Sequence, residues 1–287
     1  MNFSKARFRR RRMLDRCAHG LFFLATLVGV LVLAVLIWDT WRDGWRHLDW
    51  QFLTQFASRR PERAGILAGL AGTGGVIGLT IPLVFIIGIA TAIFLEEYQG
   101  QNRLTRFIQL NINNLAGVPS IIYGILGLAI FVRLFQLGYV VLAATLTMTL
   151  LILPIVIVAA QEALRSVPPS LRQASLALGA TKWQTIFRVV LPAALPGILT
   201  GMILALSRAI GETAPLIMVG AVTYIRAVPH GLMDPFTVLP IQIYNWVTLP
   251  NAAFHELAAA AIIVLLAVLI LMNALAIYIR NRFQRRY

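Results

Sequence analysis

Residues 170–192, SLRQASLALGATKWQTIFRVVLP, form a mostly polar stretch between long apolar segments. Ser170 follows two prolines and stands three positions before Gln173, which is the spacing of a capping box. Apolar residues then recur at helical spacing, and Gly179 stands where a residue in the left-handed conformation ends a helix. The stretch therefore predicts a short helix that begins at Ser170 and ends at a glycine corner.

A second helix is predicted directly after that corner. Thr181 and Gln184 repeat the capping-box spacing. The residues that follow, Ile186 and Phe187, are apolar and face nothing obvious, which favours a surface that docks on another protein. The alternative is a solvated loop between two membrane helices.

The composition indicates a membrane protein. Of the 287 residues, 59% are hydrophobic and only 13% are charged, which excludes a soluble domain of this size. The single cysteine, Cys17, excludes an intramolecular disulfide and a cysteine metal site. Six apolar stretches are each long enough to cross about 30 Å of hydrocarbon as a helix. They lie near residues 19–38, 65–95, 115–136, 139–160, 189–221 and 252–279.

The distribution of basic residues predicts the orientation. The net charge of +14 comes mainly from the two ends and short loops, a pattern that sets membrane topology and does not indicate nucleic-acid binding. The basic N-terminus favours the cytoplasm, and six spans return the C-terminus and residues 170–192 to that side. No small-x-small cleavage site precedes Asp39, so the first span is not a cleaved signal peptide. The first outer loop departs from the rule because it holds five arginines: Arg42, Arg46, Arg59, Arg60 and Arg63.

The segment from about 222 to 251 lies between the fifth and sixth predicted spans, on the outer side. It contains four prolines and the aromatic residues Tyr244 and Trp246. Because aromatic side chains settle at membrane interfaces, an ordered segment on the membrane surface is predicted, with a mere connector as the alternative.

Two charged residues, Arg208 and Glu212, stand in the predicted fifth span. A charge at mid-membrane costs about 2.5–3.5 kcal/mol on the insertion scale, so such residues are retained where they face a polar cavity or a partner. Their spacing of four places both on one helix face. The planar guanidinium matches an oxyanion, while Glu212 orients Arg208 or competes with the anion; Ser207 and Thr213 are candidate hydroxyl donors. The alternative is a purely structural ion pair.

Residues 170–192 resemble the cytoplasmic loop of ABC-importer permeases, in which a coupling helix inserts into a groove of the ATPase subunit. The matching positions are Gln173, Ala174, Ser175, Gly179, Leu191 and Pro192. The family's usual first residue is Glu, so Gln173 keeps the capping role but lacks the charge for a salt bridge to the ATPase. The candidate ATPase-docking residues are Ser170, Gln173, Ala174, Ser175, Gly179, Lys182 and Phe187.

The segments RAIGETAP at 208–215 and NLAGVPSIIYGILGL at 114–128 extend the resemblance to the PstA and PstC permeases of phosphate importers, from about residue 65 to the C-terminus. The resemblance implies an all-α fold with six transmembrane helices, both termini cytoplasmic and a coupling helix between spans four and five. Residues 1–64 are then the N-terminus, first span and outer loop, 65–280 the permease domain and 281–287 a basic tail.

The resemblance also implies the surroundings of the chain. These are a second permease of the PstC type, two ATPase subunits of the PstB type, an external phosphate-binding protein of the PstS type, and the lipid of a bacterial cytoplasmic membrane. ATP and magnesium belong to the ATPase subunits. This chain has no GxxxxGK[ST] loop and is expected to hold no cofactor or metal and to catalyse no reaction.

Three other functions stay open at this point. The anion could be sulfate, molybdate or phosphonate, because guanidinium chemistry does not separate these oxyanions. A passive anion channel leaves the docking stretch without a purpose. An intramembrane enzyme needs HExxH, or GxSxG with a membrane histidine, whereas the four histidines stand at span ends or in loops: His19, His47, His230 and His255.

Overall fold

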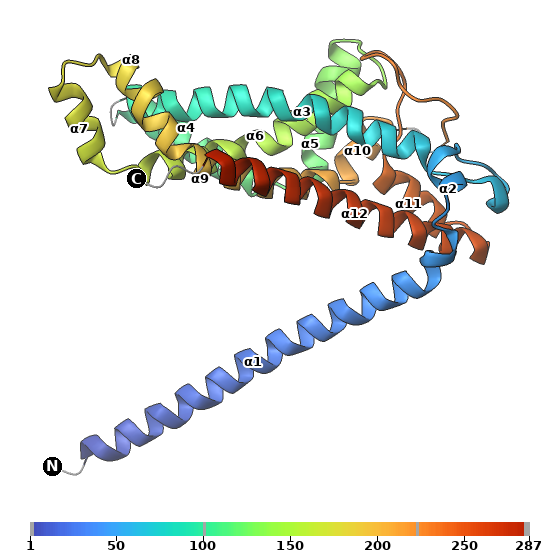
Figure 1. Cartoon of the computed structure of the whole chain (residues 1–287), viewed down its shortest axis with the longest axis horizontal. Helices are drawn as coiled ribbons and strands as arrows, with labels where there is room; N and C mark the ends of the chain where they lie inside the picture. Colours follow the sequence, from blue (N-terminus) through green and yellow to red (C-terminus); the bar gives the residue numbers. More distant parts are fainter. Residues whose placement is uncertain (1–2, 100–101, 222–223, 284–287) are drawn as a thin grey trace.

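The computed structural model describes residues 3–99, 102–221 and 224–283, and the regular elements within these ranges are all helical. This confirms the all-α prediction; the end of the expected basic tail, 284–287, lies outside the described residues. Four long helices run along the long axis of the molecule (Figure 1): α3 (Leu67–Ile93), α6 (Val141–Arg165), α9 (Leu191–Ile210) and α12 (Ala252–Phe283). Short helices occupy opposite ends of the bundle, with α7 (Pro169–Ala177) and α8 (Lys182–Thr185) at one end and α2 (Trp50–Thr54) and α11 (Leu239–Val247) at the other.

Five helical runs in the described part of the chain are long and apolar enough to cross a membrane. They are Leu14–His47, Leu67–Tyr98, Val141–Arg165, Lys182–Ile210 and Ala252–Arg282. A sixth span exists only if a bent pair, Arg103–Ala116 and Ser120–Leu134, counts as one, and these two segments meet at 105°. The third span predicted near 115–136 is therefore confirmed only as part of this bent pair, because its helix begins at Ser120 and the preceding helix meets it at an angle.

The bend has a local cause. Helix α4 (Arg103–Ala116) ends at Gly117, and α5 (Ser120–Gly127) begins after Pro119. A proline disfavours helical backbone in the residue before it, so Pro119, together with Gly117 at the end of α4, favours a break at this point. The Tyr123 hydroxyl donates a 2.8 Å hydrogen bond to the Leu115 carbonyl, which braces the corner.

The fifth span is also shorter than predicted. Helix α9 stops at Ile210, and a separate helix, α10 (Ala214–Met218), follows after a three-residue break. Gly211 follows the last helical residue, and Pro215 lies in the first turn of α10, where proline is favoured. Arg208 and Glu212, which were predicted on one face of a single helix, therefore do not lie in the same helix. Arg208 is in the last turn of α9 and Glu212 is in the break.

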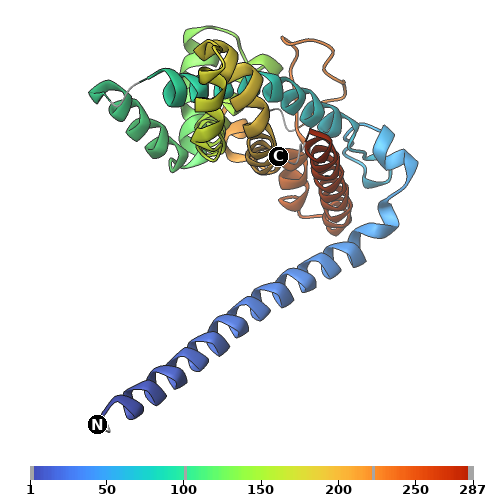
Figure 2. The ribbon, with the colours of Figure 1, turned by 60° about the vertical axis from the view of Figure 1, so that its left-hand side comes forward.

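Helix α1 (Phe3–Gly44) diverges from the rest of the molecule in both Figure 1 and Figure 2. Its most apolar stretch has a mean hydropathy of 2.9 and no buried residue. It approaches the bundle at its C-terminal end, where Gly44 lies so close to the backbone of Ala259 and Ala260 in α12 that a side-chain carbon would collide. The bundle thus leaves almost all of α1 uncovered.

The segment around α11 is ordered, as predicted, but its aromatic residues have different roles. Trp246 is buried, with its ring centroid 6.2 Å from that of Phe52 and 6.3 Å from that of Phe254. Tyr244 is exposed. The interfacial prediction is therefore wrong for Trp246, because α11 packs against α3 and α12 and carries one aromatic face into the core.

Candidate functional site

The stretch that resembles a coupling loop forms the predicted pair of helices. Gly179 has a φ of +85°, in the left-handed region, and separates α7 from α8. The capping box of Thr181 and Gln184 is confirmed, with both reciprocal hydrogen bonds present. The capping box at Ser170 is wrong: α7 begins at Pro169, so Ser170 lies inside the first turn, where its hydroxyl makes no cap.

The predicted docking residues are mostly at the surface. Ser170, Gln173, Ala174, Gly179, Lys182 and Phe187 are exposed. Ser175 is half-buried, and its hydroxyl lies 2.9 Å from that of Thr185, which ties α7 to the run that begins with α8. Ile186 is 1% exposed and belongs to the core, so the prediction that it faces a partner is wrong.

Sequence reasoning missed the largest apolar side chains of this surface. Leu178 is 89% exposed and Trp183 is 60% exposed, and the Trp183 ring lies 3.9 Å from that of Phe187, centroid to centroid. Leu176 is exposed as well. Exposed aromatic and leucine side chains around a rigid corner are typical of a protein-docking surface.

Three consecutive residues just after α3 contact the end of α6 and this loop. They lie in a wide helical turn, η3 (Phe94–Tyr98), which continues α3. Glu96 pairs with Arg165 at 2.6 Å, and Glu97 pairs with Arg172 of α7 at 2.9 Å. The Lys182 ammonium lies 5.1 Å from the centre of the Tyr98 ring. We call Glu96, Glu97 and Tyr98 the η3 anchor.

Arg172 of α7 contacts three residues outside its own helix. Besides Glu97, its guanidinium donates 2.7 Å hydrogen bonds to the carbonyls of Leu164 and Val167 at the end of α6. Its side chain is 24% exposed and that of Glu97 11%. A single residue of α7 is therefore bound to the ends of both α3 and α6.

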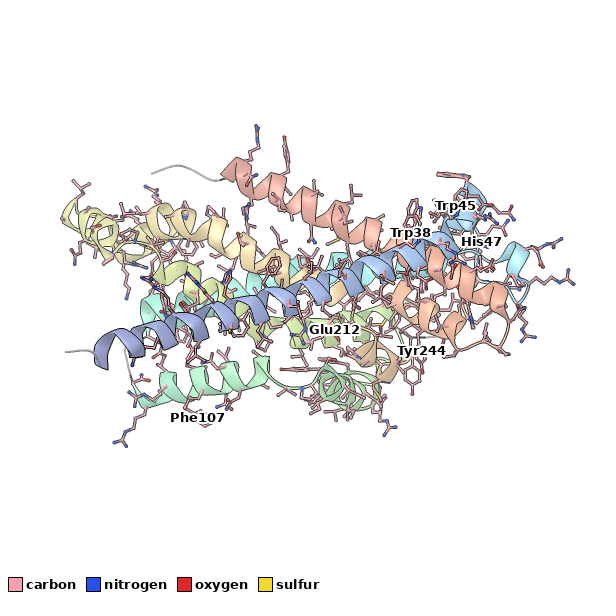
Figure 3. The ribbon with its side chains drawn as sticks, turned by 90° about the horizontal axis from the view of Figure 1, so that it is seen from below. Trp38, Trp45, His47, Phe107, Glu212 and Tyr244 are labelled. Atoms are coloured by element: carbon pink, nitrogen blue, oxygen red, sulfur yellow. The ribbon has the colours of Figure 1, made fainter. Side chains whose placement is uncertain are left out.

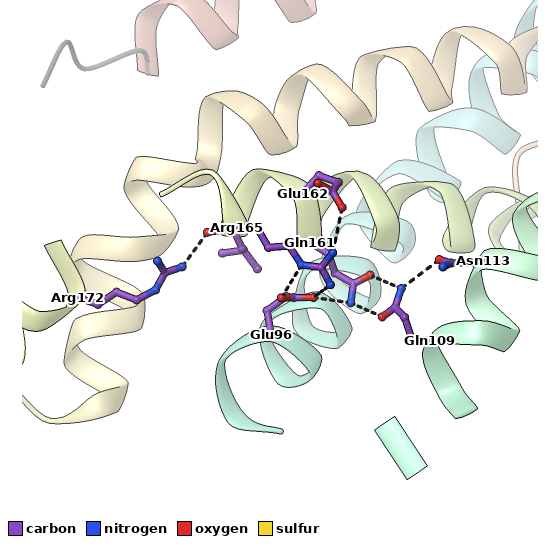
Figure 4. Close-up of polar contacts among 8 residues, drawn as sticks. Glu96, Gln109, Asn113, Gln161, Glu162, Arg165 and Arg172 are labelled. Atoms are coloured by element: carbon purple, nitrogen blue, oxygen red, sulfur yellow. Dashed lines mark hydrogen bonds and ion pairs between the residues drawn. The ribbon is translucent and has the colours of Figure 1, made fainter. Parts of the chain in front are cut away.

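A buried amide cluster extends the η3 anchor to α4 (Figure 4). Gln161 of α6 is 1% exposed, and its side chain exchanges two hydrogen bonds with Gln109 of α4, at 3.0 and 2.7 Å. The Gln161 amide also donates to Glu96 at 3.0 Å. Because unpaired buried amides are costly, this reciprocal pairing fixes α4 beside α6.

The second predicted site is the charged pair after α9. The Arg208 Nε donates to Glu212 at 3.2 Å; the Arg208 side chain is 54% exposed and that of Glu212 15%. Figure 3 places Glu212 about half-way along the bundle, between Phe107 at one end and Trp45 and His47 at the other. The pair thus presents an exposed guanidinium at intermediate depth.

Of the two predicted hydroxyl donors, Ser207 and Thr213, only Thr213 lies beside the pair of Arg208 and Glu212. The Ser207 hydroxyl donates to the Ile203 carbonyl and contacts Asn273 of α12 at 2.6 Å, so it is directed to another helix. Thr213 lies in the break beside Glu212, where its hydroxyl makes only a long 3.4 Å hydrogen bond to the Gly211 carbonyl. Thr213 is therefore the better placed of the two.

Comparison with known proteins agrees with this geometry. Residues 77–287 match the family described as "Binding-protein-dependent transport system inner membrane component". The chain belongs to this family. As a member, it is the membrane component of a transport system, and several of its helices are fit to span the bilayer.

Named members of the family match nearly the whole chain. "Phosphate transport system permease protein PstA 1" of Mycobacterium tuberculosis (strain ATCC 25618 / H37Rv) is 35% identical over 96% of this chain and 91% of its own length. "Probable ABC transporter permease protein YqgI" of Bacillus subtilis is 31% identical, over 89% and 92%. PstA of Haemophilus influenzae is 29% identical, over 98% and 97%. These relatives are transport subunits.

Solved structures of ABC importers share the fold. A chain of the inward-facing MetNI methionine ABC transporter gives a TM-score of 0.64 at 22% identity, with 77% of this chain covering 96% of that one. A chain of a bacterial ABC transporter that imports alginate gives 0.64 at 15% identity, covering 96% and 100%. The family member described here therefore has the ABC-importer permease fold, which confirms the predicted fold class.

Proposed function

We propose that this chain is a permease subunit of an ATP-driven importer that carries inorganic phosphate across the bacterial cytoplasmic membrane. The observation that carries the proposal is Arg208, a guanidinium left more than half exposed on an otherwise apolar span. Such a group is retained within a membrane protein to meet an anion or a polar cavity. The near full-length similarity to phosphate permeases supports phosphate as that anion.

Within this proposal, each residue of the pair has a distinct role. Arg208 offers two parallel N–H donors to phosphate oxygens, a geometry that lysine cannot provide. Glu212 holds the guanidinium through its Nε and leaves the terminal nitrogens for the anion. The Thr213 hydroxyl is a further donor at the break, whereas Ser207 serves the contact between α9 and α12.

The chain forms half of a pathway in this proposal. A second permease subunit of the PstC type completes it, and the uncovered surface of α1 is available to lie against that subunit. Residues 65–280 form the permease domain, with 1–64 and 281–287 as N-terminal and C-terminal extensions. An external phosphate-binding protein delivers the substrate.

Force from the ATPase subunits reaches Arg208 through a single helical run. Lys182–Ile210 continues without interruption from the docking surface to the last turn of α9. Movement of the coupling loop is thus transmitted to the guanidinium along one continuous helical run, which includes a π-helical turn at Ile186–Val190 and Pro196. ATP and magnesium are bound by two separate ATPase subunits of the PstB type, and this subunit itself catalyses no reaction.

Labelled-phosphate uptake tests the proposal. The chain is co-expressed with its second permease, ATPase and binding-protein partners in a host that lacks high-affinity phosphate uptake. We expect ATP-dependent uptake that excess unlabelled phosphate suppresses and excess sulfate, molybdate or phosphonate does not. Suppression by another oxyanion would reassign the substrate, and uptake that persists with a hydrolysis-deficient ATPase would indicate a channel.

Replacing Gly179 with valine is expected to uncouple ATP hydrolysis from phosphate uptake. No atom lies within 4 Å of the position a side-chain carbon would take, so the effect comes from φ alone. Holding a non-glycine residue in this region costs about 1–3 kcal/mol, with β-branched residues resisting most. The measurement is phosphate transported per ATP hydrolysed in reconstituted vesicles. Asparagine, which tolerates the left-handed region, is the matched control and should retain coupling; equal behaviour of the two variants would contradict the explanation.

A further inference from the structure

An open hollow at the outer end of the molecule is walled by arginine side chains. It has a volume of about 520 Å³ and is formed by the last residue of α2 and the loop after it, residues 54–60, together with Arg63 and Arg226. Its four cationic residues are Arg59, Arg60, Arg63 and Arg226, and no Asp or Glu among the described residues lines it. Arg226 comes from the outer segment before α11, so two distant parts of the sequence supply the charge.

These four arginines are not neutralised by the described part of the chain. None of them forms an ion pair with a described residue. Of the neighbouring acids, Asp49 caps α2 through the Phe52 amide and Glu256 pairs with His47 at 2.8 Å. Four exposed like charges in one concave surface repel one another, so their arrangement is favoured by an anionic partner.

A second hollow continues this surface. It has a volume of about 600 Å³ and shares Ser58 and Arg59 with the first. Its wall adds aromatic and polar side chains, namely Tyr224, Asn245, Trp246, Thr248, Leu249 and Phe254. The Asn245 side-chain nitrogen is buried and makes no hydrogen bond with a described residue, and Trp246 and Phe254 are core residues. The exposed lining of this hollow is therefore Arg59, Tyr224, Thr248 and Leu249. An exposed arginine beside an exposed tyrosine is typical of a protein–protein contact.

We infer that the two adjoining hollows form a docking surface for a carboxylate-rich face of the external binding protein. This inference rests on the proposed function, since such a partner is required only by an importer. Open arginines in water bind a single small anion weakly, because solvent and salt screen each contact. Spread over a protein-sized surface, the same charges steer association and set register. A protein partner therefore suits an open surface of this size better than free phosphate.

The test uses the complete transporter in vesicles of zwitterionic phosphatidylcholine. ATP hydrolysis is measured while phosphate-loaded binding protein is titrated. For Arg59→Glu combined with Arg60→Glu we expect the half-maximal concentration of binding protein to rise at least about ten-fold, with an unchanged maximum. Arg226→Glu, in the segment before α11, should also raise the half-maximal concentration of binding protein. Glu62→Gln removes an exposed acid beside the surface and should lower the half-maximal concentration.

Arg46→Glu is the matched control. Arg46 is an exposed outer arginine that lies over the Trp45 ring and lines neither hollow, so its reversal should leave the titration unchanged. All the altered side chains are exposed, and unchanged hydrolysis without binding protein verifies that the transporter is intact.

Four results would overturn the inference: an unchanged titration, an equal shift for Arg46→Glu, a lower maximum at the same half-maximal concentration, or a shift seen only with anionic lipid. The last two would place the arginines on the phosphate pathway or on lipid headgroups. If wild-type hydrolysis does not respond to binding protein at all, the proposed function itself fails.

Discussion

Replacing Arg208 with alanine is expected to abolish most phosphate uptake while the subunit stays inserted and assembled. Losing the hydrogen bonds of a guanidinium to a charged ligand costs about 1.5–3 kcal/mol, which corresponds to a fall of about ten-fold or more. The loss is larger in transport than in assembly, because the Arg208 side chain is 54% exposed and holds no other helix in place. Initial rates of labelled-phosphate uptake measure the effect, with the membrane level of the subunit determined in parallel.

Two variants make this result specific. Arg208→Lys keeps the charge but loses the planar fork, so we expect partial uptake with weaker apparent affinity for phosphate. Arg133→Ala removes another exposed arginine, at the end of the helical turn after α5, and should leave uptake unchanged. Normal phosphate uptake by the Arg208→Ala variant would show that the ion pair of Arg208 and Glu212 is purely structural.

Replacing Arg172 with alanine is expected to leave ATP hydrolysis running without transport. The guanidinium joins α7 to Glu97 and to the carbonyls of Leu164 in α6 and Val167 just after it, and its removal leaves a mostly buried carboxylate unpaired. Breaking such a pair costs about 3 kcal/mol or more, enough to release the coupling loop from the bundle. The readout is phosphate transported per ATP hydrolysed by the reconstituted transporter.

Conservative and neighbouring variants separate this role from a general charge effect. Glu97→Gln keeps a hydrogen-bond acceptor for Arg172 and should retain part of the coupling. Arg188→Ala removes an exposed arginine from the same region that forms no hydrogen bond or ion pair with a described residue. This variant should retain full coupling of ATP hydrolysis to transport. A fully coupled Arg172→Ala transporter would show that the η3 anchor is not part of the transmission route.

Local sequence signals predicted the features that depend on local backbone chemistry. Gly179 and the box of Thr181 and Gln184 are confirmed because a left-handed residue and a cap are decided within a few positions. The box at Ser170 fails for an equally local reason, since Pro169 already occupies the first helical position. The third span begins later than predicted because apolar length suggested one helix from about residue 115, whereas α4 ends at Gly117 and α5 begins after Pro119.

Contacts between segments far apart in the sequence could not be predicted from such local signals. Glu97 and Arg172 are 75 positions apart, and Gln109 and Gln161 are 52 apart, so no periodicity links them. Two consecutive acids at the cytoplasmic end of a predicted span, opposite a basic loop, were the available signal for the η3 anchor. Ile186 and Trp246 were misplaced because an apolar residue in a polar segment is either docking surface or core, and only packing decides between them.

The near-isolation of α1 has a consequence for how the transporter is made. Lipid tails surround an apolar helix about as favourably as protein does, so α1 gains little by folding back on its own chain. Because α1 meets the bundle near Gly44, the remaining helices can complete their packing before any other subunit is synthesised. Joining the second permease subunit of the proposed function then requires only lateral diffusion within the bilayer, and no segment has to be withdrawn or threaded a second time.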